Sequence, residues 1–165
     1  METEFLPYSD GDVACEAYVA HDPSKRGPRP AVLVFHAWGG QDDFARAKAE
    51  HLARLGYLGV AIDMYGKGLR PETQETCAKA MTPFVQDRAL LLRRASAAWN
   101  FARHHPLADT HRMGAIGFCF GGMCAHRTDH GFDGASEASL HLVVCVGGGH
   151  HGVPLVAEEQ AMRLE

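Results

Sequence analysis

Met113-Gly114-Ala115-Ile116-Gly117-Phe118-Cys119-Phe120-Gly121-Gly122 is the stretch of sequence that decides the fold of this chain. A short apolar run leads into the pattern Gly-x-Cys-x-Gly, and small residues follow it. At a sharp turn from strand to helix, the residues two positions from the tip must be small because backbone passes close to backbone there. The tip side chain then lies at a helix N-terminus, which favours the reactive thiolate form of a cysteine. The pattern predicts a nucleophile elbow, and the alternative is a glycine-rich joint with a buried, inert cysteine.

The size and charge of the chain favour one globular domain that acts on a small molecule. The chain has 165 residues, of which 46% are hydrophobic and 22% charged, enough for one core and too few for two. A net charge of −4 with interspersed signs offers no basic surface for nucleic acid or an anionic membrane. No apolar run of about twenty residues is present, and the acidic start Met1-Glu2-Thr3-Glu4 differs from a signal peptide. We therefore expect a cytoplasmic protein with neither nucleic acid nor membrane as a partner.

The cysteines give no sign of a disulfide framework or a metal centre. There are five of them, an odd number, and no two form a C-x-x-C pair. A metal site built from Cys119, Cys124 and histidines near the C-terminus lacks any standard ligand spacing. The sequence therefore predicts no metal and no cofactor.

Apolar runs and helical periodicities alternate along the chain. We predict helices from Asp42 or Asp43 to Gly56, over 71–81 and over 83–104, and a short helical segment over 121–125. The predicted strands are an edge hairpin over 5–8 and 13–20, turning at Ser9-Asp10-Gly11, and then 31–36, 57–62, 112–118 and 140–146. Such alternation is typical of a doubly wound parallel sheet. Ligands of these sheets bind beyond the carboxyl ends of the strands, where Cys119 and the loop containing Trp38 would lie.

Five short segments resemble the dienelactone hydrolase family, small α/β-hydrolases with a cysteine nucleophile. In chain order they are Tyr8-Ser9-Asp10-Gly11, Pro30-Ala31-Val32-Leu33-Val34-Phe35-His36, Leu55-Gly56-Tyr57, Asp63-Met64-Tyr65-Gly66-Lys67-Gly68 and Ala115-Ile116-Gly117-Phe118-Cys119-Phe120-Gly121-Gly122. They keep the family's order and approximate spacing over residues 5–125. The resemblance implies a three-layer α/β-hydrolase fold with an eight-stranded sheet, a Cys-His-Asp triad, and hydrolysis of a small ester or lactone.

The resemblance assigns roles to three residues of this chain. Cys119 matches the nucleophile, and the backbone N–H of Phe120 matches one donor of an oxyanion hole. Aligning Gly40 with the family's loop glycine makes the backbone N–H of Trp38 the second donor. The same alignment places Ala37 where many members carry a glutamate that interacts with the resting thiol.

The C-terminal part departs from the family pattern. After Ala125 the sequence becomes polar and broken by glycine, and neither the triad aspartate nor the triad histidine has a convincing match. We expect a single domain over 1–165, with a family-like core over 1–125 and a divergent tail over 126–165 whose order the sequence leaves open. We hypothesise that this tail is a truncated or frame-shifted end, which would leave the hydrolase sheet incomplete.

Three functions from different classes remain open at this point. The first is a hydrolase of the dienelactone hydrolase type, in which Cys119 attacks a small ester or lactone. The second is a catalytically impaired fragment or pseudoenzyme that lacks the triad aspartate and histidine. The third is a non-enzymatic interaction module that forms homo-oligomers through an exposed sheet edge.

Overall fold

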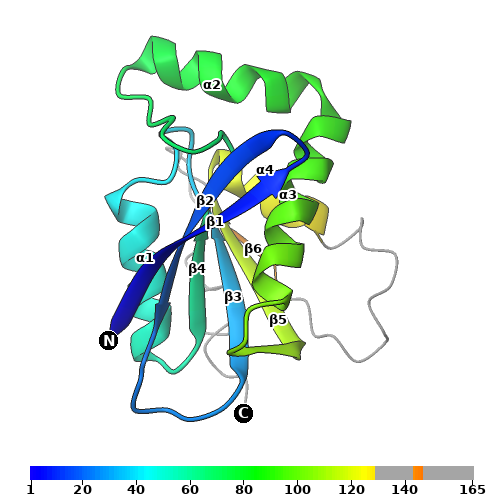
Figure 1. Cartoon of the computed structure of the whole chain (residues 1–165). Helices are drawn as coiled ribbons and strands as arrows, with labels where there is room; N and C mark the ends of the chain where they lie inside the picture. The colour runs from blue at the N-terminus through cyan, green and yellow to red at the C-terminus, as the bar shows by residue number, and fades with distance from the viewer. Residues whose placement is uncertain (129–142, 147–165) are drawn as a thin grey trace.

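A computed structural model describes residues 1–128 and 143–146 of the chain. These residues form a three-layer α/β structure around a six-stranded sheet of strand order β1-β2-β4-β3-β5-β6 (Figure 1). The strands are β1 Glu2–Asp10, β2 Val13–His21, β3 Arg29–Phe35, β4 Leu58–Ile62, β5 Ala108–Phe118 and β6 Val143–Val146. The helices are α1 Asp43–Arg54, α2 Gln74–Gln86, α3 Arg88–Arg103 and α4 Phe120–Thr128. The predicted fold class is confirmed.

The sheet combines an antiparallel hairpin with parallel strands, as the sequence predicted. β1 pairs only with β2 within this sheet, and β2 pairs antiparallel with β4. β4, β3, β5 and β6 are parallel neighbours in that order. The hairpin turns at Gly11-Asp12 rather than at the predicted Ser9-Asp10-Gly11, because Gly11 adopts the positive φ of 58° that the turn needs.

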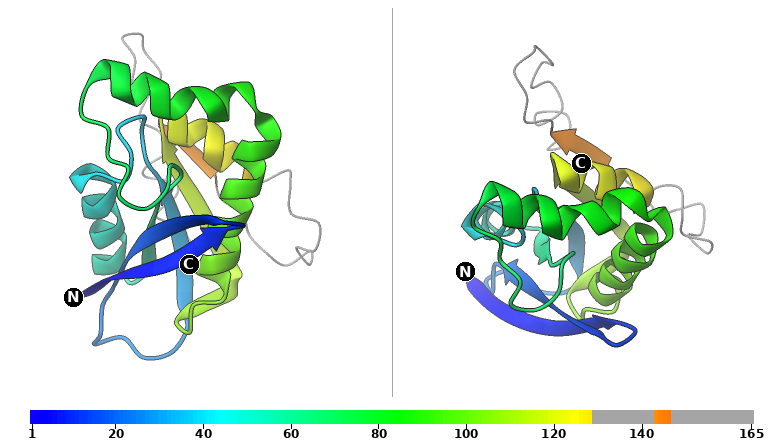
Figure 2. Two further views of the ribbon diagram at one scale, coloured as in Figure 1. Left: turned by 45° about the horizontal axis from the view of Figure 1, so that its top comes forward. Right: turned by 90° about the horizontal axis from the view of Figure 1, so that it is seen from above.

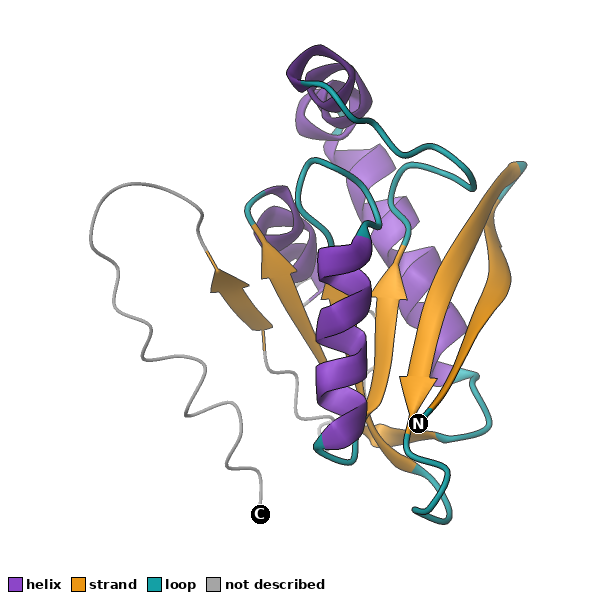
Figure 3. Cartoon of the chain, turned by 90° about the vertical axis from the view of Figure 1, so that its left-hand side faces the viewer, coloured by secondary structure: helices purple, strands orange, loops and turns teal. Residues whose placement is uncertain are grey.

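The helices cover both faces and one end of the sheet. Figure 3 shows α1 on one face of the sheet, with α3 and α4 on the other. α2 lies across the end where the parallel strands finish (Figure 1), and the right-hand view of Figure 2 looks down on that end. The carboxyl ends of β3, β4 and β5 therefore meet beneath α2.

The central strands are buried on both faces, which explains their almost continuous apolar sequence. Along β3, Leu33 and Phe35 pack into the core under α3 and α4, whereas Val34 packs into the core under α1. Gly59 of β4 lies against the backbone of α1, and a Cβ there would come within 2.8 Å of the Ala49 Cα. The absence of a side chain at position 59 is what lets α1 sit directly on the sheet.

The boundary between α2 and α3 differs from the prediction. α2 continues through Pro83 and ends at Gln86, and Asp87 separates it from α3. The Asp87 carboxylate accepts hydrogen bonds from the N–H groups of Ala89 and Leu90, which caps α3. The two helices therefore divide at the Asp87 cap, four residues after Pro83, where the second helix was predicted to begin.

The region after Ala125 is more regular at its start than the sequence indicated. α4 extends to Thr128, three residues beyond the predicted helical segment. Val143–Val146 forms β6 beside β5, within the strand predicted over 140–146. The rest of the predicted tail lies outside the described residues. Within the described part of the chain, no helix is both long and apolar enough to span a membrane.

A buried ion pair joins the hairpin to α3 and to the loop after β4. The Asp10 carboxylate accepts hydrogen bonds from Arg94 Nε at 2.9 Å and from Arg93 Nε at 2.9 Å. Only 4% of the side chain is exposed in Asp10 and in Arg94, whereas 61% of Arg93 is exposed. Arg94 Nη1 also donates to the Met64 carbonyl at 2.8 Å. Burial alone would raise the pKa of Asp10, but the hydrogen bonds from Arg94 and Arg93 lower it overall.

Replacing Gly59→Ala should destabilise the protein by roughly 2 to 3 kcal/mol, because the new Cβ overlaps the α1 backbone. Gly39→Ala is the matched control, since a Cβ there meets only Asp42 Oδ2 at 3.7 Å. Urea unfolding followed by circular dichroism measures both variants. Equal midpoints for the two variants would contradict the close approach of α1 to β4.

Replacing Asp10→Asn should cost about 3 kcal/mol at pH 7, because it leaves the Arg94 charge buried without its carboxylate. The folded-state pKa of Asp10 lies below its ordinary value of 3.8. The ion pair therefore contributes its full stabilisation of the folded state above about pH 3.8. This stabilisation disappears as the pH falls through the lower, folded-state pKa. The stability difference between wild type and Asp10→Asn should therefore shrink in acid. Arg93→Gln, at the exposed partner, should cost less than about 1 kcal/mol.

Candidate functional site

Cys119 occupies a strained turn between β5 and α4. Its φ is +54°, and among the described residues it is the one non-glycine residue with a positive φ. β5 ends at Phe118 and α4 begins at Phe120, so Cys119 alone forms the tip of the turn. The Cys119 side chain is exposed, unlike those of Cys15, Cys77 and Cys124. This is the geometry of the nucleophile elbow predicted from the sequence.

Two glycines let three pieces of backbone meet at this turn. A Cβ on Gly117 would overlap the carbonyl oxygen of Gly121, one turn later in the chain. A Cβ on Gly121 would overlap the carbonyl oxygens of Phe35 and His36 at the end of β3. Because β3 and β5 are paired with Phe35 opposite Gly117, α4 starts directly beside the loop that follows β3.

The loop after β3 is held by His36, which is fully buried. The Met64 N–H donates to His36 Nε2 at 3.1 Å, so this nitrogen must be unprotonated. Nδ1 therefore carries the proton and donates it to the Ala37 carbonyl. Burial lowers the pKa of His36, and the hydrogen bond to Ala37 raises it only in part. A neutral histidine with both nitrogens engaged holds the loop and cannot serve as a general base.

These bonds orient the N–H of Trp38. The Ala37 carbonyl also accepts the Gly40 N–H at 3.2 Å. In a trans peptide the C=O and N–H point in opposite directions, so fixing the Ala37 carbonyl directs the Trp38 N–H away from His36. Within the described residues this N–H has no protein acceptor. The N–H of Phe120, at the start of α4, is also one that no helical carbonyl can satisfy.

The structure therefore brings together the three residues that the sequence singled out. Cys119 and Phe120 lie at the elbow, and the Trp38 loop follows the neighbouring strand. The side chains differ in burial: Phe120 is 4% exposed and Trp38 is 38% exposed. The roles predicted for both residues depend on their backbone N–H groups rather than on these side chains.

No residue of the loop after β4 is among the site residues predicted from the sequence. The buried Asp63 carboxylate accepts hydrogen bonds from the N–H groups of Tyr65 at 3.1 Å and Gly66 at 3.0 Å. Arg70 lies 3.6 Å from the same carboxylate and donates to Gln41 Oε1 at 3.2 Å. The Asp63 to Gly68 segment carried part of the family resemblance, which was a signal that this loop belongs to the site.

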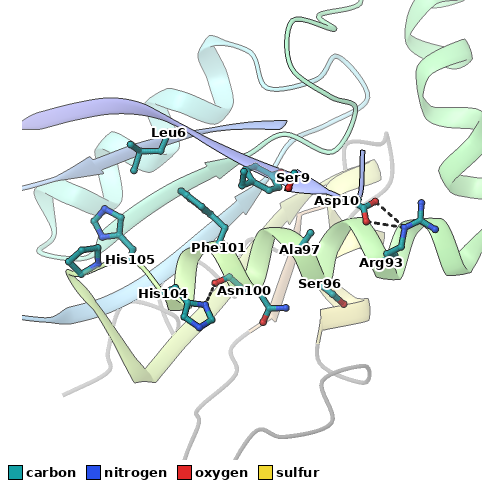
Figure 4. A pocket seen from close by; sticks show the side chains of 13 residues that line it. Leu6, Ser9, Asp10, Arg93, Ser96, Ala97, Asn100, Phe101, His104 and His105 are labelled. Atoms are coloured by element: carbon teal, nitrogen blue, oxygen red, sulfur yellow. Dashed lines mark hydrogen bonds and ion pairs between the residues drawn. The ribbon is translucent and has the colours of Figure 1, made fainter. Parts of the chain in front are cut away.

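Two hollows on the described part of the molecule are large enough to hold a small molecule. The first, about 730 Å³, runs between β1 and α3 and contains none of Cys119, Phe120 and Trp38 (Figure 4). The second, about 680 Å³, lies between the loop after β4 and α2. Tyr65 and Phe84 line this second hollow, and both rings contact Phe120. Cys119, Phe120 and Trp38 do not line the second hollow either, but two of its lining rings pack against Phe120.

The described residues hold no catalytic partner for Cys119. Across residues 1–125, whose side chains the structure describes, the Cys119 sulfur has no hydrogen bond to a histidine. In the same residues no group of three His, Cys, Asp or Glu side chains could hold a metal ion. A triad aspartate and histidine are found neither here nor by sequence matching.

The model of the dienelactone hydrolase family matches residues 15–140. The chain belongs to this family. One similar relative is the "Putative carboxymethylenebutenolidase" of Methylorubrum extorquens, 31% identical over 119 residues, which are 71% of this chain and 40% of the relative. Another is the "Probable 2-oxo-3-(5-oxofuran-2-ylidene)propanoate lactonase" of Bradyrhizobium, 28% identical over 66% of this chain and 44% of the relative. The chain thus spans less than half the length of these curated relatives.

Solved structures agree with the family assignment. The structure named m3DLH is 27% identical, with a TM-score of 0.80 over 98% of this chain and 75% of that one. A dienelactone hydrolase-like promiscuous phosphotriesterase from metagenomic libraries is also 27% identical. Its TM-score is 0.79 over 98% of this chain and 74% of that one. The predicted family and its α/β-hydrolase fold are confirmed.

The positive φ of Cys119 can be tested by comparing glycine with alanine at that position. Cys119→Gly should be more stable than Cys119→Ala by about 1 kcal/mol, because only glycine adopts this φ without strain. Met123 lies within α4 and is 38% exposed. There the order should reverse, with Met123→Ala more stable than Met123→Gly by about 1 kcal/mol. Denaturant unfolding measures all four variants, and the same order at both positions would contradict a strained elbow.

Proposed function

We propose that this chain is a hydrolase of the dienelactone hydrolase type that acts on a small ester or lactone through Cys119. The observation that carries the proposal is the exposed thiol at positive φ, at the start of α4 and beside the Trp38 loop. In α/β-hydrolases this turn serves to present a nucleophile. Family membership supports the same function.

The chemistry begins with attack of the Cys119 thiolate on the substrate carbonyl carbon. A C–S bond forms, and the carbonyl π electrons move to oxygen to give a tetrahedral oxyanion. The N–H groups of Trp38 and Phe120 donate hydrogen bonds to this oxygen and lower the barrier, because they are already oriented before reaction. Collapse of the intermediate breaks the C–O bond and leaves an acyl thioester on Cys119. The leaving alcohol takes a proton, and in a lactone it remains part of the acyl group.

Water completes the cycle by attacking the thioester carbonyl carbon. The C–O bond to water forms, the C–S bond breaks, and the thiolate returns while the product leaves as a carboxylate. Proton transfer to the leaving alcohol and from water needs a general acid and base. His36 is not that group, since both of its nitrogens are already engaged.

The second hollow suits a small substrate of mixed polarity. Its apolar wall includes Tyr65, Leu69 and Phe84, and its polar wall includes Arg70 and Lys79. The names of the two curated relatives describe a butenolidase and a lactonase, which supports a lactone or ester as the substrate class. These relatives favour the hydrolase over the impaired fragment and over the interaction module.

Replacing Cys119→Ala should lower kcat for a p-nitrophenyl ester or a small unsaturated lactone by at least about a thousandfold, because the nucleophile is lost. Cys15→Ala is the matched control, since Cys15 is buried in β2, outside the elbow. It should keep the wild-type kcat. Steady-state hydrolysis by purified full-length chains measures both, with circular dichroism to verify folding. Multiple turnovers by Cys119→Ala would refute the proposal.

A further inference from the structure

Tyr65 contacts both Trp38 and Phe120. It belongs to the loop after β4, is 8% exposed, and its own N–H is fixed by the Asp63 carboxylate. Its hydroxyl donates to the Trp38 carbonyl at 2.9 Å. Its ring stacks on the ring of Phe120, with centroids 5.6 Å apart and planes inclined by 28°. One side chain therefore contacts the two residues whose N–H groups would bind the oxyanion.

The hydroxyl fixes the second of the two peptide planes around Trp38. His36 and Gly40 hold the preceding plane through the Ala37 carbonyl, and that plane contains the Trp38 N–H. Tyr65 holds the following plane through the Trp38 carbonyl. With both planes held, φ and ψ of Trp38 are fixed, and so is the direction of its N–H. Two loops are joined in this way, one after β3 and one after β4.

The ring fixes the other donor. Phe120 is 4% exposed, and the rings of Tyr65, Phe84 and His36 surround its own, with centroids between 5.6 and 6.0 Å away. Packing on this side chain holds the first residue of α4, which bears the Phe120 N–H. Stacked and edge-on aromatic pairs of this kind contribute about 1 kcal/mol each beyond simple burial.

The hydroxyl of Tyr65 is protonated at neutral pH, because its pKa is raised above the ordinary value for tyrosine. Burial raises the pKa of Tyr65, and the nearby Cys124, Cys77 and Cys119 thiols raise it further because a phenolate would be repelled by their negative forms. The hydrogen bond to Trp38 therefore needs no particular protonation of the surroundings.

We propose that Tyr65 is the positioning residue of the oxyanion hole: its hydroxyl sets the Trp38 donor and its ring sets the Phe120 donor. The inference rests on the function proposed above and adds a residue to it. Tyr65 acts through the two donors and needs no contact with the substrate. Its loss should therefore affect steps that build negative charge on a carbonyl oxygen, and leave other reactions of Cys119 unchanged.

The test compares Tyr65→Phe with Tyr18→Phe. Tyr65→Phe removes the hydrogen bond to Trp38 and keeps the ring on Phe120. Tyr18→Phe also removes one hydroxyl, which donates to Glu50 on α1. Tyr18 lies on β2, which β4 separates from β3 and β5 in the sheet. For each chain we would measure kcat and KM for a p-nitrophenyl ester and the rate at which iodoacetamide alkylates Cys119. Alkylation occurs at a tetrahedral carbon and forms no oxyanion, so it reports the thiol alone.

Tyr65→Phe should lower kcat about tenfold, less than the 10²- to 10³-fold loss expected when a donor is removed outright. KM should stay within about twofold, and the alkylation rate should match wild type. Tyr18→Phe should match wild type in all three. An unchanged kcat in Tyr65→Phe would overturn the inference. A parallel fall in kcat and in alkylation would also overturn it, since that would mean a general structural role.

Amide hydrogen exchange separates this inference from the proposed function. Tyr65→Phe should speed exchange over residues 37–40 about tenfold and leave exchange in α1 unchanged. If wild type shows no turnover that depends on Cys119, the hydrolase proposal fails, and exchange still tests the positioning. Unchanged exchange over 37–40 would overturn the positioning role whether or not the chain is catalytic.

Discussion

The close approach of three backbone segments at the elbow is the constraint on which the rest of the site depends. Gly121 lies against the carbonyls at the end of β3, and Gly117 lies against Gly121. No side chain fits at either position, so the glycines are required by space rather than by chain flexibility. This contact fixes α4 relative to β3 and β5, and Cys119 takes its positive φ because the chain must turn within one residue. The parallel pairing of β3 with β5 then places the Trp38 loop beside the elbow.

A shell of hydrogen bonds and aromatic rings supports that contact. His36, Asp63 and Tyr65 come from the ends of β3 and β4, and each makes at least one hydrogen bond to loop backbone. Buried polar groups are costly unless they are paired, so these bonds specify one loop conformation over others. The rings of Tyr65, Phe84 and Phe120 fill the space between the loops and α2. The site is thereby rigid where the proposed chemistry needs donors in place before the substrate arrives.

The sequence predicted those features of the fold for which the residue types needed by the local turn or strand are also the ones that the packing of the whole domain needs. Gly117, Cys119 and Gly121 predicted the elbow because the turn excludes side chains at fixed offsets, and the apolar run at β3 predicted a strand buried on both faces. The helix break at Asp87 was missed because Pro83 is the stronger local signal, while the cap depends on a side-chain geometry that sequence does not display. The role of Tyr65 could not be predicted, since its partners lie 27 and 55 residues away in the chain.

The hairpin at the sheet edge takes part in the site without touching it. Asp10 at its turn holds Arg94, Arg94 holds the Met64 carbonyl, and the Met64 N–H is bonded to His36. A continuous series of hydrogen bonds therefore links the hairpin to the peptide between Ala37 and Trp38. The residues that support this site therefore include the β1–β2 hairpin, through Asp10, as well as the parallel strands. A shorter fragment chosen only by distance from Cys119 would omit the hairpin.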